Sequence, residues 1–246
     1  MTETALLALA VERLEVRAGA RRIVKQVSFT ARPGEVTAVI GPNGAGKTSL
    51  LEAIAGLRTT ESGTVSVGGQ ACASFRDRAR SFAYLPDRSE LAAEASVATL
   101  VAHALRYATA DIEVAELRRW FAIEALLDRG AGVLSRGEQQ RVLLFSALVL
   151  GRPIVLLDEP FSAFDPLQLR DVHRAVRSIA AGGATVVASI HQLTEAEKVA
   201  DRVLLLAEGE AIAFGTIAEL KAEAGNGELP LEEVFVALLA RRARVA

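Results

Sequence analysis

Residues 36–51 read VTAVIGPNGAGKTSLL and contain the strongest structural signal in the chain. The mainly apolar residues 36–40 have the composition of a buried strand, and residues 47–55 are mostly good helix formers. Between them, residues 41–48 read GPNGAGKT and match the pattern G-x-x-x-x-G-K-[ST] at every position. A strand, a glycine-rich turn and a helix in this order predict a loop that wraps around the phosphates of a nucleoside triphosphate.

The composition of this loop explains how it would bind phosphate. Glycines at 41, 44 and 46 allow positive φ and let successive N–H groups converge on an anion. The following helix directs its unpaired N–H groups and positive dipole end to the same point. Lys47 is expected to contact the β- and γ-phosphates, and the Thr48 hydroxyl to bind the accompanying Mg²⁺. The predicted nucleotide-binding residues are Gly41, Pro42, Asn43, Gly44, Ala45, Gly46, Lys47, Thr48 and Ser49.

Apolar runs and alternating patterns predict the other elements. Strands are expected at residues 7–16, 22–29, 64–67, 79–85, 154–158 and 184–190. Amphipathic helices are expected at 96–107, 111–127 and 167–181, and a helical apolar run at 142–150. This order of strands and helices indicates an α/β fold in which a parallel central sheet carries an antiparallel β subdomain and a small helical lobe at about residues 89–150.

Composition limits the class of protein. The 246 residues are enough for one large α/β domain with a sizeable core. A net charge of −2 and a pI of about 6.0 argue against non-specific nucleic-acid binding, so no nucleic-acid partner is expected. Cys72 is the single cysteine, which excludes an internal disulfide and favours a reducing compartment. Because the hydrophobic fraction is high, at 51%, part of it is expected to face a partner.

Targeting and membrane-spanning segments are not predicted. Residues 1–16 lack a basic leader before their apolar residues, so they do not form a signal-peptide pattern. Residues 142–150 are strongly apolar but too short to cross a bilayer. The uncharged stretch 178–194 is interrupted by Gly182, Gly183 and His191, and is not expected to span a membrane either.

Residues 134–141, LSRGEQQR, lead into the apolar helical run. Ser135 has the position of an N-cap, and Glu138, three residues later, that of its capping-box partner. A serine hydroxyl and a glycine N–H at a helix N-terminus also make an anion site. By itself this segment predicts a helix start, and beside a phosphate loop it becomes a candidate for a second phosphate contact.

Two acids, Asp158 and Glu159, end the apolar strand that begins at residue 154. Carboxylates at the end of a buried strand are costly unless a cation or hydrogen bonds use them. Asp158 is therefore expected to hold Mg²⁺, directly or through water, and Glu159 to polarise the attacking water. His191 follows the next predicted strand, at the carboxyl end where ligands bind in open α/β sheets.

Together these motifs resemble the nucleotide-binding subunit of an ABC transporter over about residues 7–239. Residues 134–138 resemble the family's LSGGQ signature, and the 23-residue spacing from Ser135 to Asp158 distinguishes this family from other phosphate-loop NTPases. Asp165 matches the family's D-loop, and His191 its switch histidine, which contacts the γ-phosphate. The resemblance implies a single ABC ATPase domain over residues 1–239, with the helical lobe inserted in the core, and a basic tail at 240–246.

In this family two subunits pack head to tail around two ATP molecules. The resemblance therefore implies a homodimer in which Asp165 couples the subunits. Residues implied to bind nucleotide in trans are Ser135, Arg136, Gly137 and Glu138. Residues implied to act in hydrolysis are Lys47, Glu159 and His191, and those implied to hold Mg²⁺ are Thr48 and Asp158, with Asp87 as a further candidate. ATP and Mg²⁺ are the implied cofactors.

Three positions depart from the family's pattern. Asp87 stands where most relatives carry the Q-loop glutamine, and Arg136 stands where glycine is usual. Residues 16–19 contain no aromatic side chain to stack on adenine, which leaves Arg17 as the local candidate for stacking.

The function implied is ATP hydrolysis that drives a separate membrane permease from the cytoplasmic face of the inner membrane. Residues 215–221 and 231–239 resemble the ending of ATPases from drug, sodium and lipid-type exporters, which favours export. Heme or metal-chelate transport is a second interpretation. Two functions outside transport also stay open: a soluble ABC-type ATPase and an inactive regulatory binder. Four intact residues count against an inactive binder: Lys47, Asp158, Glu159 and His191.

Overall fold

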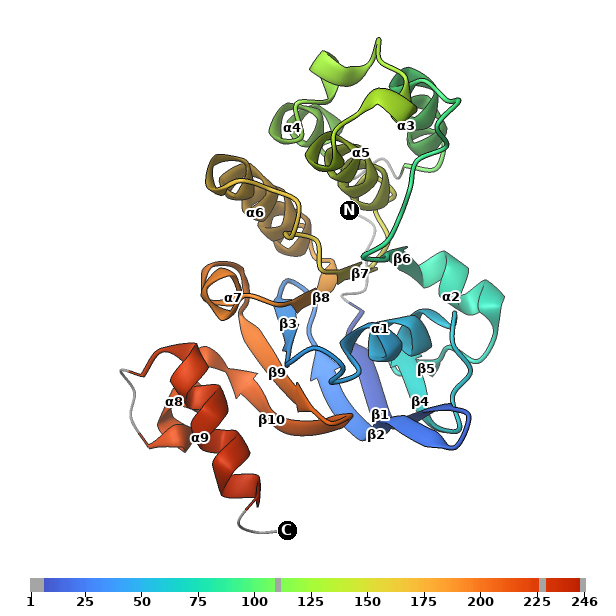
Figure 1. The fold of residues 1–246 in the computed structure, drawn as a ribbon. Coiled ribbons are helices and arrows are strands. Elements are labelled where there is room, and N and C mark those ends of the chain that lie inside the picture. The colour runs from blue at the N-terminus through green and yellow to red at the C-terminus, as the bar shows by residue number, and fades with distance from the viewer. Residues whose placement is uncertain (1–6, 109–111, 226–228, 244–246) are drawn as a thin grey trace.

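The computed structural model describes residues 7–108, 112–225 and 229–243, which form two sheets and a set of helices (Figure 1). The strands are β1 (Leu9–Ala18), β2 (Arg21–Ala31), β3 (Val36–Ile40), β4 (Ser62–Val67), β5 (Gln70–Ala71), β6 (Phe82–Leu85), β7 (Ile154–Asp158), β8 (Thr185–Ile190), β9 (Arg202–Ala207) and β10 (Glu210–Thr216). The helices are α1 (Lys47–Ala55), α2 (Phe75–Ser81), α3 (Val97–Leu105), α4 (Val114–Trp120), α5 (Arg136–Leu148), α6 (Pro166–Ala181), α7 (Leu193–Val199), α8 (Ile217–Ala224) and α9 (Leu231–Ala243), with short 3₁₀ helices at Ile123–Leu126 and Ala131–Val133.

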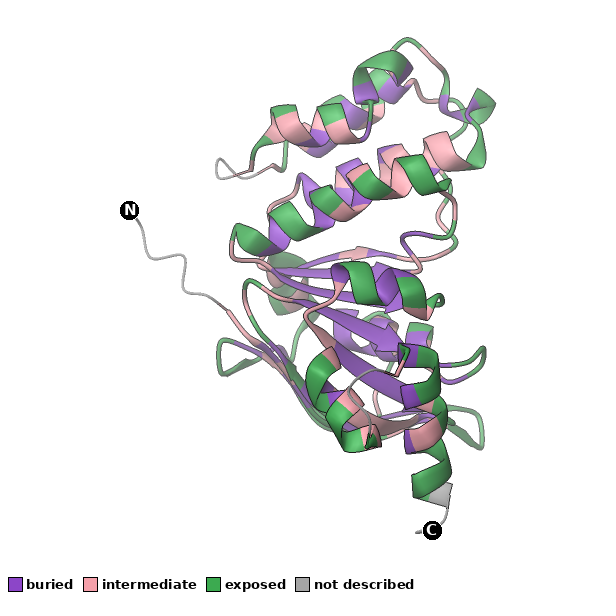
Figure 2. Ribbon diagram, turned by 90° about the vertical axis from the view of Figure 1, so that its left-hand side faces the viewer, coloured by how far each residue is buried: buried purple, intermediate pink, exposed green. Residues whose placement is uncertain are grey.

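The larger sheet has the strand order β10-β9-β3-β8-β7-β6, and all pairs are parallel except β10 with β9. Its central strands β3, β7 and β8 are buried along their whole length (Figure 2). In β3, Ala38 and Ile40 pack into one hydrophobic cluster, and Val39 into another on the opposite face. Near-continuous apolar runs are therefore required here, because both faces of the sheet are covered.

The smaller sheet is antiparallel, in the order β2-β1-β4-β5. Its apolar face shares a cluster with one face of the larger sheet, and this cluster includes Leu50, Leu51 and Ile54 of α1. The helix that follows the phosphate loop is thus packed between two sheets. The α/β fold expected from the sequence, with a parallel sheet and an antiparallel subdomain, is confirmed.

A helical lobe is built from α3, α4 and α5, with the 3₁₀ helices between α4 and α5 (Figure 1). Its buried residues, such as Val101 and Phe121, belong to the same hydrophobic cluster as one face of the larger sheet. The single helix expected at 111–127 was wrong: α4 ends at Trp120, and Ala122 has a φ of 47° before the 3₁₀ turn. Residue 111 lies outside the described residues.

The strand expected at 79–85 was also wrong in its first half. Residues 75–81 form α2, which starts with a capping box between Ser74 and Asp77, and only Phe82–Leu85 is strand β6. The missed signal was this serine followed three residues later by an acid. The basic residues Arg241 and Arg242, expected in a tail from residue 240, lie in the last turn of α9, and residues 244–246 lie outside the described part.

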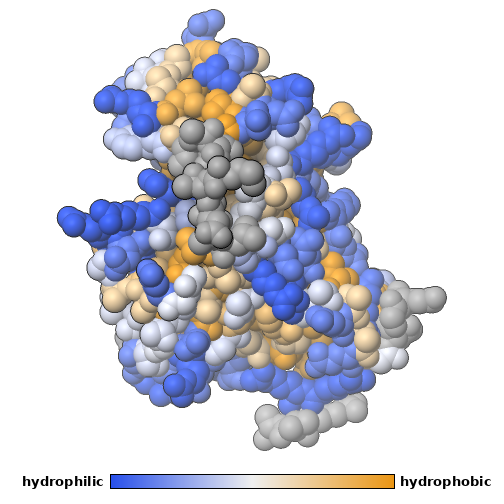
Figure 3. All heavy atoms as spheres, turned by 180° about the vertical axis from the view of Figure 1, so that it is seen from behind, coloured by the Kyte–Doolittle hydropathy of each residue, from blue (hydrophilic) through white to orange (hydrophobic). Residues whose placement is uncertain are grey.

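Apolar side chains are visible on the helical lobe from behind (Figure 3). Between lobe and core lies a groove of about 620 Å³, to which Leu117 and Trp120 of α4 and Ile179 of α6 contribute. Trp120 is partly buried and packs against the main hydrophobic cluster. None of the described helices combines the length and apolar composition needed to cross a membrane.

Candidate nucleotide-binding site

The phosphate loop connects β3 to α1, and it has the backbone geometry that its glycines predict. Gly44 and Gly46 have φ of 80° and 102°, and a Cβ on Gly41 would lie 2.0 Å from the Leu206 carbonyl oxygen. Lys47 is buried, with only 7% of the residue exposed. Its Nζ donates hydrogen bonds to the carbonyls of Gly41, at 2.8 Å, and Pro42, at 3.4 Å. The ammonium is therefore held within the loop, at the N-terminus of α1.

A cavity of about 450 Å³ opens beside this loop. From the predicted set it is lined by Asn43, Gly44, Ala45, Gly46, Lys47, Thr48, Ser49 and Glu159. Its other lining residues are Ala18, Arg21, Arg22, Ile23 and Glu208, none of which the sequence analysis selected. Arg17, the candidate for stacking on adenine, is instead paired with Glu61, with Nε 2.5 Å from Oε2. Besides Lys47, the exposed Arg21 and Arg22 of β2 place positive charge on the cavity wall.

One hydroxyl connects the two acids at the end of β7. Asp158 is fully buried, and its Oδ1 accepts a 2.5 Å hydrogen bond from the Ser189 hydroxyl. The Glu159 N–H donates to the same serine oxygen at 2.9 Å. Ser189 is the register partner of Asp158 on the adjacent strand β8, so the parallel pairing itself brings the two side chains together. Sequence analysis missed this residue, because only the strand register reveals it.

The donor set fits a divalent cation. Within the described residues, Asp158 Oδ2 is buried without a hydrogen-bond partner. Such an orphaned carboxylate oxygen is costly unless a cation or water binds it. Thr48 lies on the wall of the neighbouring cavity, and carboxylate and hydroxyl oxygens are the ligands that Mg²⁺ prefers.

His191 and Glu159 lie in the same part of the molecule. Both line a smaller cavity, of about 150 Å³, and Glu159 also lines the larger one. Glu159 has a φ of 49°, an uncommon conformation for a residue with a side chain, at the turn after β7. The carboxyl ends of β3, β8 and β7 are neighbours in the sheet, so the phosphate loop, His191 and the two acids meet along one edge.

Asp87 lies beyond β6, the edge strand next to β7. Burial raises the pKa of Tyr84, and the negative charges of Asp158, Glu52 and Asp87 raise it further. Asp87 is half-buried and is not part of the cavity wall that the described residues form beside the phosphate loop. It therefore shares an acidic neighbourhood with Asp158 without facing that cavity.

The signature segment lies apart from this edge. Ser135 caps α5, and the expected capping box with Glu138 is confirmed: the Ser135 N–H donates to Glu138 Oε2 at 2.8 Å, and the Glu138 N–H to Ser135 Oγ at 3.3 Å. Ser135 and Arg136 are exposed, and a Cβ on Gly137 would lie 3.1 Å from the Ala163 carbonyl oxygen. None of the residues 135–138 lines the cavity that the described residues form at the phosphate loop.

Asp165 is the N-cap of α6. Its Oδ1 accepts hydrogen bonds from the N–H groups of Leu167 and Gln168, both at 2.9 Å. The segment that leads to it, through Ala163, packs against Gly137. The signature segment and the D-loop are thus neighbours within one chain.

Comparisons with known proteins agree with this geometry. The family model of the ABC transporter matches residues 24–162. The chain is 30% identical over 222 residues to the ABC-type transporter ATP-binding protein EcsA of Bacillus subtilis, covering 88% of this chain and 90% of that protein. It is 38% identical over 241 residues to the hemin import ATP-binding protein HmuV of Pseudomonas fluorescens, covering 92% of each. The solved structure of an ATP binding subunit of an ABC transporter matches with a TM-score of 0.86 and 30% identity, over 94% of this chain and 99% of that one. The chain therefore belongs to the ABC transporter family, as an ATP-binding subunit whose ATPase activity is coupled to transport.

Proposed function

We propose that this chain is one half of a head-to-tail dimer that binds two ATP molecules and drives a separate membrane permease from the cytoplasmic face. One observation carries the proposal. The phosphate loop and the two acids meet at one edge of the sheet, whereas the exposed Ser135 of the signature segment belongs to no part of that cavity within the described chain. Each ATP site is completed when the signature segment of a second subunit covers it.

The proposed roles follow from the chemistry of each group. Lys47 binds the β- and γ-phosphates as a point charge, and Glu159 orients and activates the attacking water. His191 contacts the γ-phosphate, since it lines the same small cavity as Glu159.

Thr48 and Asp158 hold Mg²⁺, which when bound neutralises charge on the phosphates. Ser135 and the Gly137 N–H contact the γ-phosphate from the opposite subunit, where hydrogen-bond donors stabilise its charge.

The Glu159→Gln variant tests the dimer, because it removes the base but keeps a side chain of similar size. We expect it to bind ATP and to form a stable homodimer, measured by size-exclusion chromatography with light scattering. ADP should leave it monomeric, and Lys47→Ala in the same background should abolish the response. A variant that binds ATP yet stays monomeric at high protein concentration, with its permease present, would contradict the proposal.

Export is the direction that we infer from the resemblance of the ending of the chain to exporter ATPases. Uptake of heme or a metal chelate is the second candidate, supported by 38% identity over 241 residues to a hemin import ATP-binding protein. The test is to solubilise native membranes in mild detergent and identify what co-purifies with the tagged chain. A permease alone supports export, and a permease with an extracytoplasmic binding protein supports uptake. Recovery without any membrane protein would favour a soluble ATPase.

A further inference from the structure

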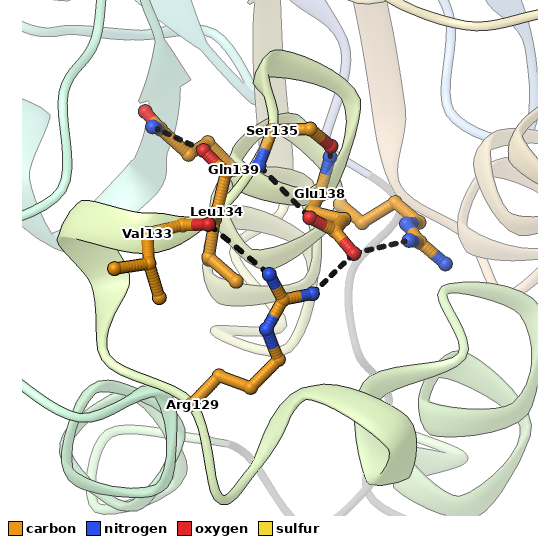
Figure 4. A network of polar contacts seen from close by, with 7 residues as sticks. Arg129, Val133, Leu134, Ser135, Glu138 and Gln139 are labelled. Atoms are coloured by element: carbon orange, nitrogen blue, oxygen red, sulfur yellow. Dashed lines mark hydrogen bonds and ion pairs between the residues drawn. The ribbon is translucent and has the colours of Figure 1, made fainter.

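A polar network supports the signature segment, and in it the Glu138 carboxylate lies between Ser135 and the Arg129 guanidinium (Figure 4). Arg129 Nη1 donates to Glu138 Oε1 at 2.5 Å, and Nη2 donates to the Val133 carbonyl at 3.1 Å. The other carboxylate oxygen of Glu138, Oε2, accepts the N–H of Ser135. The Arg129 guanidinium thus links the Val133 carbonyl, which precedes α5, to Glu138, whose carboxylate belongs to the capping box of α5.

Glu138 creates an electrostatic conflict at this place. Its carboxylate supports the helix start, but it is a negative charge within one turn of the Ser135 hydroxyl and the Gly137 N–H, which are proposed to receive a phosphate. The hydrogen bond from the Ser135 N–H lowers the pKa of Glu138 most; partial burial opposes this shift, and the Ser135 side chain and then Arg129 lower the pKa further. The group therefore remains ionised at neutral pH. An uncompensated carboxylate here would repel the γ-phosphate.

The position of Arg129 resolves this conflict. Its guanidinium binds Glu138 directly, whereas the nearest atom of Arg141 is 3.9 Å from the same oxygen. Only 20% of the Glu138 side chain is exposed, so the interaction is less screened by solvent than an ordinary surface pair. Gln139 Nε2 adds a hydrogen bond to the Leu134 carbonyl at 3.1 Å, which further orders the segment.

We propose that Arg129 is a positioning residue for the phosphate site that acts in trans: it neutralises the Glu138 carboxylate and ties it to the Val133 carbonyl, leaving Ser135 and Gly137 to contact the γ-phosphate. Arg129 does not itself touch nucleotide. The inference rests on the proposed head-to-tail dimer. It predicts that Arg129 governs dimer closure without affecting the binding of ATP to a single subunit.

The test uses Arg129→Met in the Glu159→Gln background. We expect ATP affinity of the monomer, measured by titration calorimetry at low protein concentration, to change by less than about twofold. We expect ATP-dependent dimerisation, measured by sedimentation, to need at least ~10-fold more protein, which corresponds to about 1.4 kcal/mol. Arg118→Met is the matched control, because Arg118 pairs with Glu124 at 2.6 Å on the same lobe, and it should dimerise like its parent.

A charge rescue separates this role from a purely structural one. Adding Glu138→Gln to Arg129→Met removes the carboxylate charge that Arg129 no longer balances and that, in the single variant, keeps only the longer 3.9 Å contact with Arg141. The amide oxygen of Gln still accepts the Ser135 N–H, and we expect dimerisation to recover. Raising the salt concentration should also reduce the defect of Arg129→Met. If Arg129→Met does not fold, Arg129→Lys, which keeps the charge but not the two-pronged contact, should show a smaller defect of the same kind.

The outcomes distinguish the two proposals. Normal dimerisation of Arg129→Met, or a defect that Glu138→Gln does not relieve, would overturn the role of Arg129 and leave the dimer intact. If the Glu159→Gln parent binds ATP but does not dimerise, both proposals fall.

Discussion

Ser189 illustrates how much of the site depends on one small side chain. Its hydroxyl donates to Asp158 and accepts from the Glu159 N–H, so it orients both acids at the end of β7. It is fully buried, as is Asp158. Without this hydroxyl, one more oxygen of Asp158 would lack a partner.

We therefore predict that Ser189→Ala lowers ATP turnover about tenfold or more, and raises the Mg²⁺ concentration needed for half-maximal activity. Loss of a buried hydrogen bond to a charged group should also reduce the free energy of unfolding by roughly 1–3 kcal/mol. The measurements are ATPase assays over a Mg²⁺ titration and urea unfolding. Ser178→Ala, at an exposed site on α6, is the control. An unchanged Mg²⁺ dependence would show that Ser189 does not orient the cation site.

His173 makes a second residue-level prediction. Its Nε2 lies 3.2 Å from Glu195 Oε2, and its ring packs edge-on against Phe161, with centroids 4.8 Å apart. Burial lowers the pKa of His173 below 6.5; Glu195 opposes this shift and Lys198 adds to it. The folded protein therefore binds a proton at lower pH than the unfolded chain does. Stability should fall as the pH drops from 6.5 to the lowered pKa, and should be insensitive to this group above 6.5.

The check is urea unfolding at pH values above and below this window. In His173→Gln this contribution, at most about 1.4 kcal/mol per pH unit, should disappear. His103→Gln, at an exposed site on α3, should keep the pH dependence of the parent. Equal slopes in His173→Gln and the parent would contradict the assignment.

At the scale of elements, α2 anchors the far end of the phosphate-loop helix. Arg78 Nη1 donates to the carbonyls of Ala53 and Ile54, both at 2.6 Å, and Nε donates to the Cys72 carbonyl at 3.0 Å. The last carbonyls of a helix lack partners within it, and a cation there also complements the helix dipole. The C-cap residue after α1, Gly56, has a φ of 80°, and a Cβ there would lie 2.4 Å from the Arg78 side chain.

Arg78→Met should consequently lower the free energy of unfolding by about 1–3 kcal/mol, since it removes the guanidinium donor from these carbonyls, of which Ala53 keeps the Gly56 N–H. The midpoint of urea unfolding measures the effect. Arg76→Met, at an exposed position of the same helix, should stay within roughly 0.5 kcal/mol of the parent. Equal midpoints for the two variants would mean that the cap contributes nothing measurable.

At the scale of the whole molecule, the proposed dimer predicts complementation between two inactive chains. Lys47→Ala removes the phosphate-loop cation, and Ser135→Ala removes the hydroxyl proposed to act in trans. In a mixed dimer one site carries both defects and the other carries neither. Random mixing should then restore about a quarter of wild-type sites, because about half of the dimers are mixed and each has one intact site.

ATPase assays on each variant alone, and on mixtures at constant total protein, measure this recovery. A mixture of Lys47→Ala with Glu159→Gln is the control, because these residues serve the same site from the same chain, and it should not recover. Activity in the mixture no higher than the mean of the two variants would argue that Ser135 acts on its own chain.

Local patterns were sufficient for several elements. The expected strand at 36–40 and helix at 47–55 coincide with β3 and α1, and the capping box of Ser135 and Glu138 is present as expected. These features depend on neighbouring residues: glycines that allow positive φ, a polar cap, and an apolar run. The expectation for 79–85 failed because a local cap at Ser74 starts a helix that outweighs the apolar run.

By itself, the sequence determined the phosphate loop, the paired acids at a strand end and the α/β fold class, since each is written in a contiguous stretch. Only the tertiary structure decided that Ser189 reaches Asp158, that Arg129 pairs with Glu138, and that residues 135–138 line no part of the phosphate cavity of their own chain. The reason is physical: such contacts join side chains from different elements. Strand order, strand register and helix packing determine which of these side chains meet. Those three features depend in turn on how the whole hydrophobic core is buried.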